Sequence, residues 1–170
     1  MVAHIPDDRA KHPRTILAGP YGHPLHPILI TVPVGSWIAA LVFDVMALLS
    51  EDRAGLLMGS QILVGIGIVG ALVAAILGFL DYSVIPPRTP AKRTAVVHMV
   101  LNLLAVVVFA FSWLARASAD GEEIPVIGIA LTLIGLALIS VSGYLGGKLA
   151  YHYGVRVAGE EKQVEGFQKL

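Results

Sequence analysis

The sequence predicts an all-α fold: an integral membrane four-helix bundle that forms one membrane domain over residues 1–170 and keeps both termini in the cytoplasm. Hydrophobic residues make up 56% of the chain and charged residues only 14%, whereas about a quarter of an ordinary soluble domain is charged. Charges this scarce cannot cover the surface of a soluble protein. The apolar residues also gather into four long runs, and Lys and Arg concentrate on one side of them. Together these observations predict the bundle.

Each apolar run is near or above the roughly 20 residues that cross a bilayer core as a helix, and the expected spans are residues 28–49, 56–80, 95–115 and 126–149. The first span follows 27 residues and has no small-residue cleavage site after it, so we expect it to stay in the mature protein rather than leave as a signal peptide. Short polar connections predict antiparallel neighbours. Small residues recur every four positions on the second and fourth spans and predict close helix packing there: Gly70, Ala74 and Gly78, then Gly143 and Gly147.

The placement of basic residues predicts the orientation. Ten of the twelve Lys and Arg residues lie in the N-terminal tail, the second loop or the C-terminal end, and the other two loops carry one each, Arg53 and Arg116. The positive-inside rule therefore places both termini and the central loop in the cytoplasm. Because twelve acidic residues balance the basic ones, the composition argues against a nucleic-acid partner and favours the lipid bilayer. The chain has no cysteine, which excludes disulfides, thiolate-bound iron–sulfur clusters and cysteine zinc sites within it.

The segment His23-Pro24-Leu25-His26-Pro27 is the most unusual part of the sequence. A residue before proline favours extended geometry, so we expect both histidines to lie outside regular helix and Pro27 to start the first helix. In a polyproline-like stretch the repeat is three residues, so His23 and His26 would face the same way and could share one ligand. The nearby positive end of the helix dipole favours neutral imidazoles, the form that binds metals. An interfacial helix cap with two surface histidines is an equally open interpretation.

Further polar side chains are expected at the cytoplasmic end of the other three spans. Asp81 ends the second span, His98 and Asn102 lie one turn apart at the start of the third, and His152 follows the fourth. An imidazole or carboxylate inside a bilayer is costly unless it is paired, so His98 is a functional-site hypothesis. The alternative is structural: His98 hydrogen-bonds Asp81 and joins two helices.

Asp44 lies inside the first span, near its outer end. It is the one formal charge in the interiors of the apolar runs, apart from Lys148 at an edge. A carboxylate embedded in a membrane needs a partner. Arg53 or Arg116 could supply an ion pair, and Gln61 could supply a hydrogen bond from the second span. A protonated Asp44 that handles protons is a further alternative.

Several of these segments together resemble a bacterial membrane family built around an HPLHP motif, the domain of unknown function DUF2231. The matching residues extend over nearly the whole chain: Gly22 to Pro27, Phe43-Asp44, Gly78 to Tyr82, Arg93, His98, Asn102, and Gly146 to Tyr151 with Gly154-Val155. The resemblance implies a four-helix domain in the bacterial inner membrane. Some relatives carry a Rieske-type iron–sulfur domain on the same chain, which implies a link to electron transfer. Many relatives have a histidine after the double glycine, where this chain has Lys148, and His152 is the alternative histidine one turn further on.

Three hypotheses about function follow from these residues. The first is a redox subunit that holds b-type haem between His98 and either His26 or His152. The second is a divalent transition-metal site formed by His23, His26, His98 and Asp81. The third is a structural subunit without a cofactor, part of a larger membrane complex or a homo-oligomer. We expect an accessory or redox-linked subunit, with haem and metal equally open. The absence of an inverted-repeat pattern disfavours transport by the chain alone.

Overall fold

The computed structural model describes residues 10–11, 15–16, 18–19, 23–157, 159 and 164. Within these residues the fold is all-α and has no strand, which confirms the predicted fold class. The elements are α1 (His26–Leu29), α2 (Thr31–Leu49), α3 (Ala54–Ser83), α4 (Pro90–Ala117), α5 (Val126–Gly147) and the π-helical turn η3 (Lys148–His152). Some residues that enter the motif or the charge count lie outside the described residues: Arg9, Arg14, Gly22, Lys162 and Lys169.

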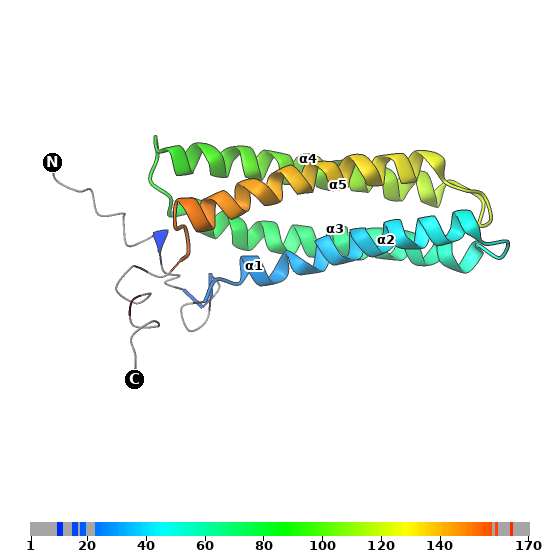
Figure 1. Cartoon of the computed structure of the whole chain (residues 1–170), viewed down its shortest axis with the longest axis horizontal. Coiled ribbons are helices and arrows are strands. Elements are labelled where there is room, and N and C mark those ends of the chain that lie inside the picture. The colour runs from blue at the N-terminus through cyan, green and yellow to red at the C-terminus, as the bar shows by residue number, and fades with distance from the viewer. Residues whose placement is uncertain are drawn as a thin grey trace.

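Four helical segments in the described part of the chain are long and apolar enough to cross a membrane, which confirms the prediction of four spanning helices. They are His26–Leu49, Ala54–Ser83, Pro90–Ala117 and Val126–His152. The helices form two antiparallel hairpins, α2 with α3 and α4 with α5, which pack into one bundle (Figure 1). The start of α1, the end of α3, the start of α4 and η3 share one end, the histidine end. The α2–α3 and α4–α5 loops share the other, the loop end.

The first turn of α4 begins earlier than the apolar run predicts, at Pro90 rather than at residue 95. The hydroxyl of Thr89 caps this turn by accepting a hydrogen bond from the backbone N–H of Lys92 at 3.1 Å. Pro90 suits the first turn because the N–H that it lacks would have no helical acceptor there. Capping chemistry, rather than hydrophobicity, therefore sets where α4 begins.

The histidine–proline segment differs from its prediction. His26 is the first residue of α1, whereas we expected it outside regular helix, and Pro27 follows it in the first turn. A first-turn proline breaks no helical hydrogen bond, so the helix can include the residue before it. A second proline explains the break between α1 and α2 at Ile30. Pro33 has no N–H to donate to the carbonyl of Leu29, so one helical hydrogen bond is missing there.

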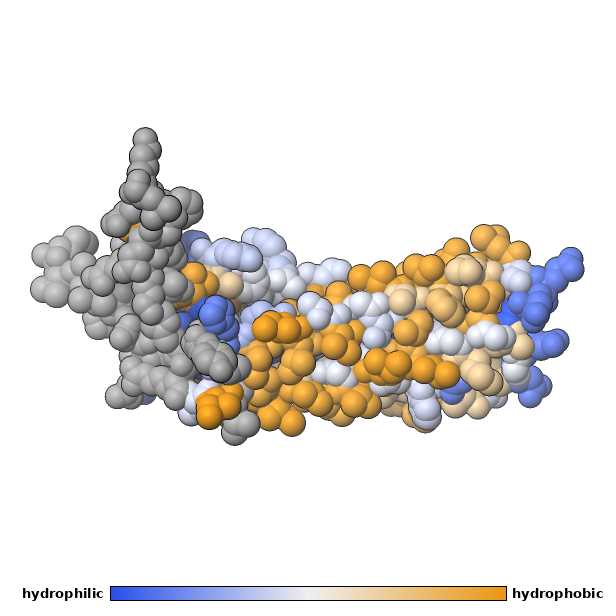
Figure 2. Space-filling model, turned by 90° about the horizontal axis from the view of Figure 1, so that it is seen from below, coloured by the Kyte–Doolittle hydropathy of each residue, from blue (hydrophilic) through white to orange (hydrophobic). Residues whose placement is uncertain are grey.

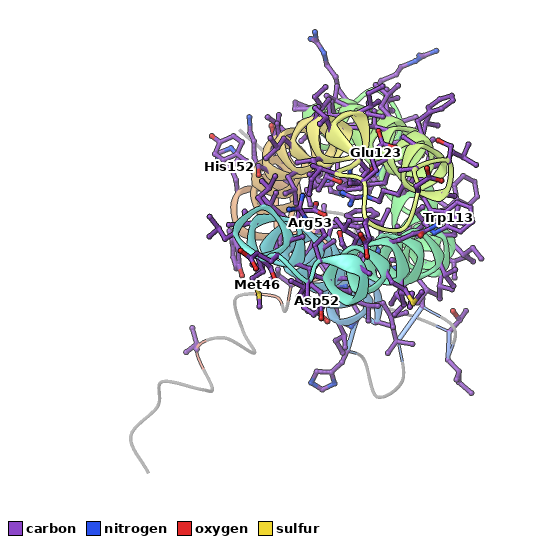
Figure 3. All side chains as sticks on the ribbon, turned by 90° about the vertical axis from the view of Figure 1, so that its right-hand side faces the viewer. Met46, Asp52, Arg53, Trp113, Glu123 and His152 are labelled. Carbon is purple, nitrogen blue, oxygen red and sulfur yellow. The ribbon has the colours of Figure 1, made fainter. Side chains whose placement is uncertain are left out.

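The face of the bundle seen in Figure 2 is apolar along most of its length. Large hydrophobic side chains point outward from the spans, among them Leu49 at 85% exposure, Ile76 at 67% and Phe111 at 59%. Met46 and Trp113 lie on the outside of the bundle when it is viewed along its axis from the loop end (Figure 3). Such a surface requires an apolar solvent, so the chain is a multi-pass membrane protein.

The interior consists of small and polar residues around one aromatic pair. Trp37 on α2 and Phe109 on α4 stack with ring centroids 3.8 Å apart and planes inclined by 8°. Gly67 on α3 lies against the Trp37 ring, and a Cβ added at Gly135 on α5 would lie 2.6 Å from the Phe109 ring. The missing side chains let each aromatic ring fit between helices that approach closely. This pair separates two clusters of polar residues, one toward each end of the bundle.

Candidate functional site

The polar layer lies between the aromatic pair and the loop end and consists of Asp44, Ser60, Ser112, Arg116 and Thr132. Arg116 on α4 donates to both carboxylate oxygens of Asp44 on α2, from Nη1 to Oδ1 at 2.6 Å and from Nη2 to Oδ2 at 2.7 Å. Asp44 is 0% exposed and Arg116 is 4% exposed. This bidentate geometry is the strongest form of ion pair. Of the partners predicted for Asp44, the structure has Arg116 rather than Arg53 or Gln61.

Hydroxyl groups satisfy the rest of the guanidinium. Nη1 also donates to Ser60 Oγ at 3.0 Å, Nη2 to Thr132 Oγ1 at 3.0 Å and Nε to Ser112 Oγ at 3.3 Å. A guanidinium has five N–H donors, so each one has an acceptor here. These three hydroxyl residues cannot be predicted from the sequence, because single Ser and Thr residues in apolar helices carry no spacing signal. The polar layer joins all four long helices and has no unused donor for a ligand.

A cavity of about 220 Å³ lies beside the polar layer at the loop end. Its lining includes Gln61, Arg116, Asp120 and Glu123. Because the N–H groups of Arg116 are all engaged, its guanidinium has no donor left for an anion in this cavity. Arg116 therefore offers no anion site in this cavity.

The histidine layer lies on the other side of the aromatic pair and consists of His26 and His98 with their hydrogen-bond partners. His26 belongs to α1. Its Nδ1 lies 2.8 Å from the carbonyl oxygen of Ala74 on α3. A carbonyl oxygen only accepts, so Nδ1 carries the proton and Nε2 carries the lone pair. The ring lies against Gly78, where an added Cβ would come within 2.9 Å of it. Among the described residues, Nε2 of His26 has no hydrogen-bond partner.

His98, near the start of α4, has a matching arrangement against α5. Its Nδ1 lies 2.8 Å from the carbonyl oxygen of Ser142 and 2.9 Å from the Ser142 hydroxyl. Its Nε2 accepts a hydrogen bond from the Asn102 amide at 3.1 Å. The ring lies against Gly146, where a Cβ would come within 3.2 Å. The alternative hydrogen bond from His98 to Asp81 is not made, so His98 joins α4 to α5 rather than to α3.

The imidazoles of His26 and His98 are neighbours inside the bundle. Their ring centroids are 6.5 Å apart and their planes are inclined by 89°. Both residues are half-buried. In each ring a backbone carbonyl holds Nδ1–H and so fixes the tautomer and the orientation of the ring. Metal-ligating histidines are held in this way.

The other predicted site residues lie apart from this pair. Oδ1 of Asp81 accepts a hydrogen bond from Nε of Arg156 at 2.7 Å. His23 is exposed, and so is His152, whose ring packs against Tyr153 at the periphery of the bundle (Figure 3). Over the described ranges, no group of three or more His, Cys, Asp or Glu side chains could hold a metal ion. The described structure therefore does not bring the four predicted ligands together around one point. The four-ligand metal site stays a prediction.

Comparison with known families places the chain. A family model described as predicted membrane protein (DUF2231) matches residues 22–159. The chain belongs to the DUF2231 family. The same comparison confirms the resemblance inferred from the sequence motifs. Searches of curated proteins and of solved structures gave no match.

The matched range of this DUF2231 protein includes both layers. Lys148, which stands where the resemblance leads us to expect a histidine, starts η3 and has its Nζ 5.6 Å from the ring centroid of Tyr153. It does not join the imidazole pair. The histidine layer is the candidate site because it combines two oriented imidazoles with one unpartnered nitrogen, whereas the donors of the polar layer are saturated.

Proposed function

We propose that this DUF2231 protein is an accessory subunit of the bacterial inner membrane, linked to a redox complex, in which His26 and His98 bind one metal centre. The observation that carries the proposal is the fixed tautomer of both rings. Each Nδ1–H is donated to a backbone carbonyl of a neighbouring helix. Each Nε2 is thereby left with the lone pair through which an imidazole binds a metal.

The separation of the rings supports a shared metal. An imidazole nitrogen binds a metal at about 2 Å, which places two ring centroids roughly 6 Å apart when both coordinate one ion from opposite sides. The centroids of His26 and His98 are 6.5 Å apart. Rotation of a ring about its bond to the metal does not change this distance, so the steep angle between the planes is compatible with shared binding.

The number of protein donors favours haem iron over a bare ion. Two imidazoles complete the coordination of an iron that a porphyrin holds through its own nitrogens, whereas a divalent ion would need further ligands from water. Gly78 and Gly146 let the two rings pack directly against α3 and α5, which holds each imidazole in place. A bound haem would supply one-electron transfer. The chain would contribute two imidazole donors, His26 and His98, and the helices that orient them.

The distribution of charge supports a cytoplasmic position for the histidine layer. At the histidine end, Arg88 lies in the α3–α4 connection, and Lys92 and Arg93 lie in the first turn of α4. Of the two basic residues at the loop end, Arg116 is buried in its ion pair with Asp44, which leaves Arg53 near the surface. By the positive-inside rule, the histidine end faces the cytoplasm.

Purification of the full chain in detergent tests the proposal. Absorption spectra and elemental analysis are recorded on one preparation, before and after incubation with haem and with divalent transition metals. We expect either the absorption bands of bis-histidine haem or, without pigment, close to one metal ion per chain. A protein that takes up neither haem nor metal would contradict the proposal.

Three single-residue variants make the test specific to the site. His26→Ala and His98→Ala should each abolish the pigment or the metal, because each removes one of the two donors. His152→Ala is the matched control, since its imidazole lies at the same end of the bundle but is exposed on η3. It should leave binding unchanged.

A purely structural subunit is the second candidate function, and the bonds of His98 favour it. Its Nδ1 and Nε2 both have partners, Ser142 and Asn102, as in a polar contact that only joins helices. If this function is correct, His98→Ala lowers the stability of the bundle while parental protein and variant alike contain no pigment and no metal.

A further inference from the structure

We infer that the chain is a tandem duplication of one helical hairpin: residues 26–83 and 98–152 are two copies that pair through equivalent surfaces about a pseudo-two-fold axis along the bundle. The inference does not rest on the proposed metal site. It follows from contacts that recur at constant offsets in residue number. One offset relates residues of α1–α2 to their counterparts in α4, and a second relates residues of α3 to their counterparts in α5.

Three contacts between the copies join residues 72 positions apart in the sequence. The buried ion pair joins Asp44 to Arg116. The stacked aromatic pair joins Trp37 to Phe109 at the same offset, and so does the imidazole pair of His26 and His98. A residue that touches its own counterpart lies beside the axis that relates the copies. Three such contacts, spread along the bundle, define that axis.

Contacts within each copy repeat at a second offset, of 68 residues between α3 and α5. His26 lies against Gly78 and donates to the carbonyl of Ala74, while His98 lies against Gly146 and donates to the carbonyl of Ser142. Glycine and carbonyl therefore occupy counterpart positions in both copies. Each ring donates to the residue one turn before its glycine.

The aromatic residues repeat the same relation. Trp37 packs against Gly67, and Phe109 packs against Gly135, which is again 68 residues further on. Trp37, Phe109, Gly67 and Gly135 are all buried. The two copies thus place an aromatic ring of their first helix over a glycine of their second helix at equivalent depth.

In the polar layer the counterpart positions remain equivalent, but the hydroxyl group lies on the first helix in one copy and on the second helix in the other. Ala40 and Ser60 in the first copy correspond to Ser112 and Gly128 in the second, and Val64 corresponds to Thr132. The Ser60 hydroxyl shares its proton between the Ala40 carbonyl at 3.0 Å and Asp44 Oδ1 at 2.7 Å, and the Ser112 hydroxyl donates to the Gly128 carbonyl at 2.7 Å. The same two positions are bonded in each copy, with the hydroxyl on opposite members of the pair.

The different position of the serine in the two copies has a steric reason, and the different charges of Asp44 and Arg116 decide which hairpins can pair. Arg116 passes over Gly128, where a Cβ would lie 2.9 Å from its Cγ, whereas the smaller Asp44 leaves room for a serine at the counterpart position. A hairpin paired with a copy of itself would bury two carboxylates or two guanidinium groups. Like charges inside a bilayer are strongly unfavourable, so the partner that fits the inner face of each hairpin is the other hairpin.

Exchanging the polar layers of the two copies tests the inference in the full chain. The exchange variant carries A40S, D44R, S60G, V64T, S112A, R116D, G128S and T132V, so that each position receives the residue of its counterpart. If the copies are equivalent, we expect a yield of monodisperse protein in detergent within about a factor of three of the parental protein, because every partner is restored across the axis.

The two halves of the exchange are the controls. The first four substitutions alone place two guanidinium groups opposite each other, and the last four alone place two carboxylates there. Each half should lower the yield of folded protein by roughly a factor of ten or more. A smaller exchange, W37F with F109W, is compared with its own single variants in the same way. The inference stands if either exchange recovers folded protein relative to its halves, and it is overturned if neither does.

Discussion

The polar layer and the histidine layer join the same two hairpins, yet they leave different atoms available. In the polar layer, Arg116 uses every N–H on Asp44 and three hydroxyl groups, and the side chains are buried. In the histidine layer the rings are half-buried, and Nε2 of His26 has no hydrogen-bond partner among the residues that the structure describes. A saturated buried network fixes which hairpins pair, whereas an oriented imidazole with an available lone pair can bind a ligand.

Removing one charge of the polar layer should have the largest effect. Arg116→Met leaves the Asp44 carboxylate buried without a cation, and we expect it to lower the free energy of unfolding by about 3–5 kcal/mol. The double variant Asp44→Leu with Arg116→Met removes both charges and should regain at least half of that loss. Detergent unfolding followed by circular dichroism measures both. If the single variant is as stable as the parental protein, the polar layer does not hold the hairpins together.

The two histidines should differ in what they contribute to stability. His98→Ala removes bonds to Ser142 and Asn102, whereas His26→Ala removes one bond, to Ala74. At about 1 kcal/mol for each hydrogen bond, we expect a loss of about 2 kcal/mol for His98→Ala and about half of that for His26→Ala. The same unfolding assay measures both variants. Equal losses would show that Asn102 adds nothing to the stability of the histidine layer.

A methyl group placed beside an imidazole should disturb binding more than folding. Gly78→Ala brings a Cβ to 2.9 Å from the His26 ring, so the ring must move away from the position in which it faces His98. We expect a loss of bound haem or metal with a stability change of about 1 kcal/mol. The matched control is Gly143→Ala on α5, where an added Cβ meets nothing within 4 Å. Binding that survives Gly78→Ala would separate the ring position from ligand binding.

Asn102→Leu should have the smallest effect on stability, about 0.5 kcal/mol, because its amide bonds only to His98 of the same helix and such a bond lies at the low end of the usual range. The amide of Asn102 donates to Nε2 of His98, the atom that the proposed metal needs. Removing this competitor should therefore raise the affinity for haem or metal, measured by titration of the purified protein. A fall in affinity would instead make Asn102 part of the binding site.

Much of the fold could be predicted from sequence because the thickness of a bilayer sets the length of an apolar helix. The position of Asp44 inside a span predicted a buried partner and included Arg116 among the candidates. The choice between Arg116, Arg53 and Gln61 depends on how the helices face each other, which hydropathy does not encode. The start of α4 depends on Thr89, a capping residue outside the apolar run.

The histidine layer was predicted only in part. The positions of His26 and His98 at one end of the bundle could be predicted, but their acceptors are backbone carbonyls of Ala74 and Ser142, which leave no side-chain pattern. Asp81 lies at the same end of the bundle as the histidines, yet Arg156 from the C-terminal segment holds its carboxylate. Folding of that segment back onto α3 follows no periodicity in the sequence.

The internal repeat is also invisible in the sequence for a physical reason. Counterpart positions such as Trp37 and Phe109, or Asp44 and Arg116, keep a place in the packing but not an amino-acid type. Identity persists only at a few positions, including the two histidines themselves. Geometry rather than sequence similarity relates the two hairpins.

The most direct test of a shared metal centre is X-ray absorption spectroscopy of the purified full chain at the edge of the metal it contains, haem iron included. We predict two imidazole nitrogens at about 2 Å from the metal in the parental protein, and at most one around any residual metal that His26→Ala retains. A metal shell without imidazole, or one unchanged in both His26→Ala and His98→Ala, would show that the histidine layer is not the binding site.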